Sequence, residues 1–444
     1  MKTSKNLLEK FLSLFTVVKA GEGITAILLS FNLFVLMCSY YIMKSVREAL
    51  ILAGGGAEVK SYAAAGQAIL LIGAVKLFSM LASRMPRRQL INAVTIFYVC
   101  CLGLFYVLAQ INVPLGVVFY LWLGIFNLMM PALLWSFSND IYSIEAGKRI
   151  FVIIAVGAQL GAIFGSYLAE RLVKPLGVYQ LLLAASGILI LVLFVTNIVD
   201  SREKREASPL QGEAKQDSDK PIGSKGAFQL VFRNRYLLLI AFLMISLNLV
   251  NTTGEYILGK TILGVATEAV SNGTAGELSI EQYITMVYAG FYKYVNIATL
   301  LIQLFAVSRI LKYFGTRVAL LILPVIALLG YSIIIFFPVL AIVRWAKTAE
   351  NSTDYSLQNT VRQVLFLPTT REQKYKAKQA IDTFFVRAGD VLSAVLVFVG
   401  TTWLSFRVKE FAVFNLGLVI IWIILALIIG REYRRLVKNG ETSE

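Results

Sequence analysis

Apolar stretches long enough to cross a membrane recur along most of this chain of 444 residues. A transmembrane helix needs about 20 predominantly apolar residues, because the hydrocarbon core of a bilayer is about 30 Å thick. Backbone polar groups find no water in that core and must bond within the helix. We therefore predict an all-α membrane protein with twelve transmembrane helices. They are expected at residues 24–50, 61–83, 90–110, 115–139, 150–171, 179–199, 234–262, 283–308, 318–338, 340–365, 377–404 and 410–430.

The twelve predicted helices fall into two sets of six, which suggests two pseudo-symmetric bundles. The segment between them is charged, poor in aliphatic side chains and rich in Ser, Gly and Pro, so we expect a flexible linker. Near the N-terminus, leucines and phenylalanines share one helical face and lysines the other, which predicts a helix lying on the membrane surface. The predicted organisation is an amphipathic interfacial helix at 1–22, an N-terminal bundle at 23–199, a cytoplasmic linker at 200–232, a C-terminal bundle at 233–430 and a cytoplasmic tail at 431–444.

Composition excludes several classes of protein. Hydrophobic residues make up 58% of the chain and charged residues 15%, which is too apolar for a soluble globular protein. Histidine is absent, so the chain has no imidazole metal site and no histidine proton relay. The three cysteines lie in apolar runs without metal-binding or redox spacing, and no phosphate loop or nucleophile elbow occurs. We therefore expect neither an enzyme nor a bound cofactor.

The 42 Lys and Arg residues concentrate in every second predicted loop and at both ends of the chain. Because cytoplasmic loops are enriched in Lys and Arg, this asymmetry predicts that both termini are cytoplasmic. The net charge of +16 is therefore assigned to membrane topology and not to nucleic-acid binding. The predicted outer loops hold few cations, namely Lys60, Arg171, Lys174, Lys260, Arg407 and Lys409.

The tenth predicted helix contains an unusual polar stripe. At about 100° per residue, one narrow sector of this helix contains Arg344, Lys347, Asn351, Asp354, Gln358 and Arg362. A charge at the bilayer centre costs about 2.5 to 3.5 kcal/mol even on insertion scales. The stripe must therefore face a wet cavity or a charged ligand, and its surplus of cations favours an anionic substrate.

Other predicted helices add polar groups at matching spacings. Lys44, Arg47 and Glu48 share a face of the first helix, and Asn251 and Glu255 share a face of the seventh. Tyr292 and Asn296 do so on the eighth.

Each of these groups also has a structural interpretation. Lys44 and Arg47 could extend to the membrane interface, with Glu48 neutralising one of them. Arg387 and Asp390 are spaced as a structural pair, and Gly157, Gly161 and Gly165 predict a close helix contact.

Two stretches resemble the nucleotide transporter family of ATP/ADP exchangers from plastids and intracellular bacteria. One is ENSTDYSLQN at 350–359, followed by Arg362 and by KYKAKQAID ending at Asp382; the other is MKSVREALILAGGGAE at 43–58. The departures from the exchangers' pattern resemble those of relatives in free-living bacteria. The resemblance implies a twelve-helix, major-facilitator-like carrier that exchanges nucleotides across a bacterial cytoplasmic membrane. We expect it to act as a monomer in the lipid bilayer on a small anionic substrate.

The leading hypothesis, a carrier of nucleotides such as ATP and ADP or of related phosphorylated anions, gives the polar residues specific roles. Anionic groups would be bound by Lys44, Arg47, Arg344, Lys347 and Arg362. Base or sugar contacts would come from Asn251, Glu255, Tyr292 and Asn296, with Asn351 also in the substrate site. Gating or coupling by exchange of ion pairs would use Glu48, Glu350, Asp354, Asp382 and Arg387.

Two alternatives stay open on the sequence. The first is proton-coupled transport of a non-nucleotide anionic solute, with Glu255 or Asp354 carrying the proton. The second is a membrane scaffold in which the buried charges are structural pairs.

Overall fold

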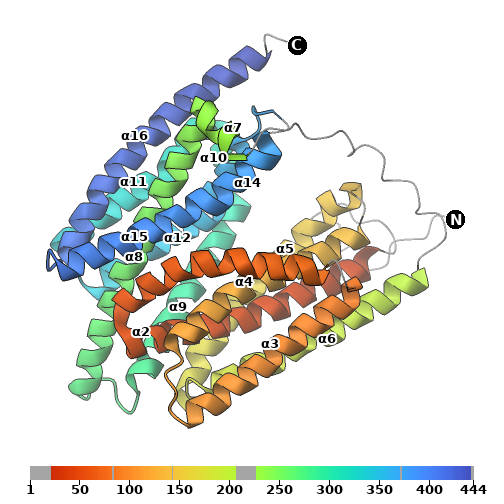
Figure 1. Cartoon of the computed structure of the whole chain (residues 1–444), viewed down its shortest axis with the longest axis vertical. Helices are drawn as coiled ribbons and strands as arrows, with labels where there is room; N and C mark the ends of the chain where they lie inside the picture. The colour runs from red at the N-terminus through yellow and green to blue at the C-terminus, as the bar shows by residue number, and fades with distance from the viewer. Residues whose placement is uncertain (1–21, 83–84, 143, 207–226, 371–372, 442–444) are drawn as a thin grey trace. The chain divides into compact units, whose positions relative to one another are not determined.

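The computed structural model describes residues 22–82, 85–142, 144–206, 227–370 and 373–441, and every regular element in these ranges is helical (Figure 1). The predicted surface helix at 1–22 apart from Glu22, most of the predicted linker and the last residues of the tail lie outside the described residues. The helices up to residue 313 are α2 (Glu22–Ala82), α3 (Arg87–Gln110), α4 (Gly116–Ile141), α5 (Ile144–Leu176), α6 (Gln180–Glu206), α7 (Ala227–Arg233), α8 (Arg235–Ser271), α9 (Ile280–Leu301), η1 (Ile302–Ala306) and α10 (Val307–Tyr313). They are followed by α11 (Gly315–Phe336), α12 (Leu340–Thr353), η2 (Asp354–Gln358), α13 (Asn359–Leu365), η3 (Gln373–Ala377), α14 (Lys378–Ala380), η4 (Ile381–Phe385), α15 (Val386–Thr402) and α16 (Val408–Glu441).

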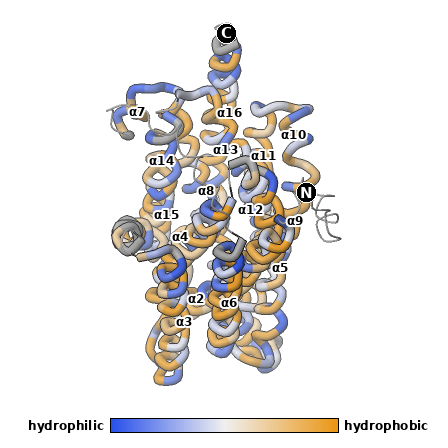
Figure 2. The backbone as a smooth tube through the Cα atoms, turned by 90° about the vertical axis from the view of Figure 1, so that its right-hand side faces the viewer, coloured by the Kyte–Doolittle hydropathy of each residue, from blue (hydrophilic) through white to orange (hydrophobic). Residues whose placement is uncertain are grey.

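Among the described residues, ten helices are long and apolar enough to cross a membrane. Hydrophobic colouring dominates long helices such as α3 and α5 in Figure 2. The ten spans differ from the twelve predicted helices at two places. The first and second are joined in α2, which bends at Gly56 with φ 79°, a left-handed value that glycine tolerates. The tenth is divided among α12, η2 and α13 and is too polar to qualify.

The chain clusters into two compact units. Unit 1 takes its residues from Met1–Gly54, Ile69–Asp219 and Glu277–Lys293. Unit 2 takes its residues from Gly55–Ala68, Lys220–Gly276 and Tyr294–Glu444. Both α2 and α9 therefore contribute to each unit, whereas the sequence-based division into bundles at 23–199 and 233–430 stays a prediction.

In unit 1, α5 packs directly against the first part of α2 through a glycine ladder. A Cβ added at Gly157, Gly161 or Gly165 would lie 2.1 to 2.3 Å from the backbone oxygens of residues 30, 34 and 38, respectively. Both sets recur every four residues, so one face of each helix meets the other along successive turns. The predicted close helix contact is confirmed.

The rest of unit 1 is built on aromatic and aliphatic packing. Helix α3 runs along α6 and also contacts α4 (Figure 1). Between α3 and α4, the ring of Trp122 stacks on Phe119 at 5.5 Å and meets Phe105 edge-on at 5.1 Å. These rings continue into an apolar core that holds the polar part of α2 in place.

In unit 2, α8 packs against α12, α15 and α16, and α11 packs along α16. Gly389 of α15 fits against α8 closely, because a Cβ there would lie 2.9 Å from the carbonyl oxygen of Ile245. This arrangement brings the polar faces of α8 and α12 together.

Four π-helical turns, η1 to η4, occur in the described part of unit 2. A π-helix holds more residues per turn than an α-helix, and such turns are frequent at functional sites. The turn η2 covers Asp354–Gln358, in the middle of the predicted polar stripe. Because each residue of a π-helix advances by a smaller angle about the helix axis, the side chains after η2 are rotated by about 90° from the positions that a continuous α-helix would give them. The prediction of one straight stripe through Arg362 is therefore wrong beyond Asp354.

Candidate functional site

In unit 1, Arg47 and Glu48 of α2 form an ion pair that is linked to α9. Arg47 donates from Nε to Glu48 Oε1 at 3.1 Å, and its Nη2 contacts the same oxygen. Tyr292 donates its hydroxyl to Glu48 Oε1 at 3.2 Å. The Glu48 side chain is completely buried and that of Arg47 is 13% exposed. The structural interpretation, that Glu48 neutralises a neighbouring cation, is confirmed for Arg47.

Aromatic rings surround the cations of this cluster. Lys44 Nζ lies 4.1 Å from the centre of the Tyr292 ring and 5.0 Å from that of Tyr41. The Arg47 guanidinium lies 4.6 Å from the ring centre of Tyr120 on α4. Cation–π contacts of this kind strengthen when the cation is desolvated. The sequence suggested Tyr292 but not Tyr41 or Tyr120 as members of the cluster.

In unit 2, Lys347 of α12 is 1% exposed and lies among oxygen atoms from two helices. Its Nζ is 3.0 Å from Glu350 Oε1 and 3.9 Å from Glu255 Oε1. It donates to the side-chain oxygen of Asn251 at 2.9 Å, and the backbone oxygen of Asn251 is 3.4 Å away. The predicted residues of α8 and α12 thus meet around one buried ammonium group.

Tyr331 of α11 holds the other end of Glu350. It donates its hydroxyl to Glu350 Oε2 at 3.1 Å, and the carbonyl oxygen of Val250 is 3.4 Å from the same hydroxyl. Gly254 makes room for this arrangement, because a Cβ there would lie 2.1 Å from Tyr331 Oη and 3.0 Å from Lys347 Nζ. The sequence analysis did not name Tyr331. The signal that could have indicated it is that Tyr331 is the single tyrosine in the apolar stretch at 318–338.

Glu255 extends the cluster toward a second lysine. It accepts a hydrogen bond from Asn351 Nδ2 at 3.0 Å, and its Oε2 lies 3.7 Å from Lys60 Nζ. Lys60 was predicted to lie in an outer loop, and this is wrong, because the residue is 6% exposed within α2. The helix continues past Gly56 and so places Lys60 in unit 2. Lys60, Glu255, Lys347 and Glu350 together form a cluster of balanced charge, here named the four-charge cluster, in which Glu255 is 22% exposed and the other three side chains are buried.

A separate pair lies beyond the π-helical turn η2. Arg362 of α13 donates from Nη2 to Asp382 of η4 at 3.0 Å. The carboxylate of Asp354, at the start of η2, makes no hydrogen bond or ion pair with another described residue. Gln358, at the end of η2, is fully buried, and neither atom of its amide has a hydrogen-bond partner in the described part of the chain.

The predicted pair of Arg387 and Asp390 is confirmed, at 3.0 Å between Nη1 and Oδ2. Asp390 also accepts hydrogen bonds from Asn248 at 2.7 Å and Thr252 at 2.8 Å, both on α8. This group fastens α15 to α8 and is separate from the four-charge cluster.

Two further predicted residues lie in other surroundings. Arg344 of α12 places its guanidinium 5.7 Å from the ring centre of Tyr294 and makes no ion pair with a described residue. Asn296 of α9 is 2% exposed within unit 2. Neither residue joins the contacts of Lys347.

The sequence of this chain is similar to a known protein family and to individual carrier proteins. The family model of the Major Facilitator Superfamily matches residues 23–353. An ADP,ATP carrier protein 1 from Chlamydia pneumoniae is 23% identical over an alignment that covers 68% of this chain and 64% of the relative. An ADP,ATP carrier protein 2 from the same organism is 21% identical, over 89% of this chain and 86% of that protein. The chain thus spans less than two thirds of the first relative.

Solved structures agree on the fold. The nucleoside transporter NupG superposes with a TM-score of 0.60 at 12% identity, covering 93% of this chain and 99% of that protein. A peptide transporter of the POT type in complex with sulfate superposes with a TM-score of 0.62 at 11% identity, covering 97% and 99%. At such identities the likeness concerns the fold alone.

Proposed function

Because this chain belongs to the Major Facilitator Superfamily, and is therefore a multi-pass membrane transporter and not an enzyme, we propose that it exchanges nucleotides or related phosphorylated anions. The relatives named ADP,ATP carriers support this substrate class. We propose the bacterial cytoplasmic membrane as its location, with both termini in the cytoplasm. Its substrate is then a small anion that must lose water to reach the buried cations.

The observation that supports the proposal most strongly is the burial of Lys347 among Glu350, Glu255 and Asn251. Removing one partner of a buried ion pair costs about 3 to 5 kcal/mol, because an uncompensated charge remains. A phosphate group that replaced a carboxylate beside Lys347 would keep this charge compensated. Exchange of one anion for another at the lysine therefore fits a carrier that releases one substrate only when it receives the next.

The remaining predicted residues have roles in this proposal. In unit 1, Arg47 and Lys44 offer positive charge, and the tyrosine rings offer faces for a base. In unit 2, the carboxylates of Glu350 and Asp382 would move between their cation and an alternative partner as the substrate enters and leaves. In the structure, Glu350 pairs with Lys347 and Asp382 pairs with Arg362.

Counterflow in reconstituted vesicles tests this function. Vesicles loaded with unlabelled ADP or ATP should accelerate the entry of labelled nucleotide. We expect Arg362→Gln to abolish this acceleration while membrane expression stays normal. Arg407→Gln, which removes an exposed arginine of the same unit, is the control and should transport normally. Normal counterflow by Arg362→Gln, or no acceleration by any nucleotide in the unaltered protein, would contradict the proposal.

A second candidate function is proton-coupled transport of a non-nucleotide anion. The observation that favours it is Asp354, a partly buried carboxylate without a hydrogen-bond or ion-pair partner among the described residues. A protonophore separates the two functions, because strict exchange needs only a counter-substrate. Uptake that stops with the protonophore and with Asp354→Asn would support the second candidate.

A further inference from the structure

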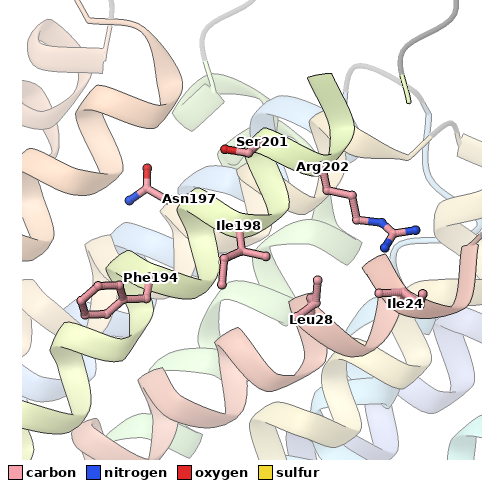
Figure 3. Close-up of a pocket in the computed structure, with 7 residues that line it drawn as sticks. All are labelled: Ile24, Leu28, Phe194, Asn197, Ile198, Ser201 and Arg202. Atoms are coloured by element: carbon pink, nitrogen blue, oxygen red, sulfur yellow. The ribbon is translucent and has the colours of Figure 1, made fainter. Parts of the chain in front are cut away.

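The exposed face of η2 and α13 in unit 2 is polar, which is unusual for a membrane helix. On α6 of unit 1 the exposed side chains are apolar, with Phe194 62% and Ile198 54% exposed (Figure 3). On η2 and α13, Tyr355 is 40% exposed, Asn359 is exposed and the side chain of Arg362 is 23% exposed. Both elements pack against α11, which is long and apolar enough to cross a membrane. An amide exposed at that depth must meet water or a polar ligand, because hydrocarbon offers it no hydrogen-bond partner.

The π-helical turn η2 sets the direction of this face. Asn359 follows Lys347 by twelve residues, which in a continuous α-helix would place the two side chains about 120° apart around the axis. The rotation of about 90° across η2 brings them to within about 30° of each other. Asn359 therefore faces nearly the same way as Lys347, about 18 Å further along the segment. The exposed amide thus lies on the face that contains the proposed anion site.

Three kinds of chemical group follow one another along this face. Tyr355 offers an aromatic ring, and Asn359, one turn later, offers an amide with both a donor and an acceptor. Arg362 offers a guanidinium whose Nε is buried and has no hydrogen-bond partner in the described part of the chain. The helix rises by about 10 Å from Tyr355 to Arg362. A ligand with a flat ring, a donor–acceptor edge on that ring and an anionic group beyond it would match this order.

We propose that Tyr355 and Asn359 bind the adenine base of the transported nucleotide, next to a phosphate on Arg362. This inference rests on the proposed function and assigns the residues that read the base. The Tyr355 ring would stack on the base, as aromatic side chains do on nucleobases. Asn359 would donate from Nδ2 to N7 of adenine and accept from its amino group, the pairing that asparagine makes with adenine elsewhere. The guanidinium of Arg362 would bind phosphate oxygens.

Counterflow with ADP and with 7-deaza-ADP, in which a carbon replaces N7, tests the role of Asn359. Half-maximal counterflow by the unaltered protein should need about ten-fold more 7-deaza-ADP than ADP, because a hydrogen bond to N7 is lost. Asn359→Ala should raise the concentration needed for ADP about ten-fold and abolish the difference between the two nucleotides. Asn272→Ala, which removes an exposed amide at the end of α8, is the control and should keep the difference.

Two results would overturn the inference while leaving nucleotide exchange in place. One is equal counterflow of ADP and 7-deaza-ADP by the unaltered protein, and the other is unchanged discrimination by Asn359→Ala. Tyr355→Leu examines stacking separately: it should weaken counterflow of both nucleotides by the same factor, because stacking does not depend on N7. A normal response of this variant to both nucleotides would refute the stacking role.

Thermal unfolding of the purified, unaltered protein gives a readout that needs no variant to fold. ADP should raise the melting temperature more than equal concentrations of 7-deaza-ADP or inorganic pyrophosphate do. Equal stabilisation by ADP and pyrophosphate would show that phosphate alone is recognised and would overturn the base contact. Neither exchange nor stabilisation with any nucleotide would refute the proposed function, and this inference with it.

Discussion

Replacing Gly254 by alanine should disturb the four-charge cluster through Tyr331. The new Cβ would lie 2.1 Å from Tyr331 Oη, whereas a carbon and an oxygen in van der Waals contact are about 3.3 Å apart. The hydroxyl would have to move by roughly 1.2 Å. It would then lose its 3.1 Å hydrogen bond to Glu350, which is 4% exposed. A hydrogen bond to a charged group contributes about 1.5 to 3 kcal/mol, so we expect a destabilisation of about 2 kcal/mol.

Thermal unfolding of the purified protein in detergent measures this effect. For a chain of this size the loss corresponds to a fall of about 2 to 4 °C in the melting temperature. Gly264→Ala is the matched control on the same helix, because a Cβ there meets no atom within 4 Å. This control should unfold at or slightly above the temperature of the unaltered protein, because alanine has a higher helix propensity than glycine.

A double-mutant cycle decides whether the clash with Tyr331 is the cause. Tyr331→Phe removes the atom that the new Cβ would meet, so the two substitutions together should cost less than the sum of their separate effects. Additive losses would refute the reasoning. Equal losses for Gly254→Ala and Gly264→Ala would refute it as well, since they would reflect helix α8 in general.

Two further substitutions probe the packing of unit 1 and the π-helical turn of unit 2. Gly161→Ala should separate α5 from α2, because its Cβ would lie 2.1 Å from the backbone oxygen of Phe34, and overpacking of this kind typically costs about 1 to 3 kcal/mol. Unfolding temperatures should fall for this variant but not for Gly187→Ala, which has open space, and an equal fall in both would contradict the ladder. Gln358→Met should raise the unfolding temperature, because it removes two buried amide atoms that lack partners, and we expect slower counterflow if the amide meets substrate during transport. An unfolding temperature below that of the unaltered protein would show that the Gln358 amide forms stabilising hydrogen bonds in the folded protein.

The spacing of residues three or four apart in the sequence predicted the contacts made along single helix faces. The glycine ladder on α5 could be recognised because its members are four residues apart, and Arg387 and Asp390 could be paired because they are three apart. The apolar stretches predicted the helical membrane fold because their length reflects the thickness of the bilayer. In each case the determining interaction lies within one helix or along one of its faces.

The contacts between helices were harder to predict. Lys60 meets Glu255 from a part of the chain almost two hundred residues away, and no spacing rule connects them. Tyr331 looked like one more residue of an apolar helix, although its hydroxyl holds Glu350. The sequence does not predict the π-helical turn η2, because the hydropathy pattern does not distinguish a π-helical turn from an α-helical one.

The extra residue within η2 also offers a way for the polar stripe on α12, η2 and α13 to rearrange. A helix that contains one surplus residue can shift that surplus along its axis, so that a π-helical turn migrates by exchanging a few backbone hydrogen bonds. Each step would rotate the side chains it passes while the ends of the segment stay in place. Arg362 and Asp354 could thereby change the direction in which they face without any unwinding of α12 or α13. Such a reorientation would need no sliding of one helix past another.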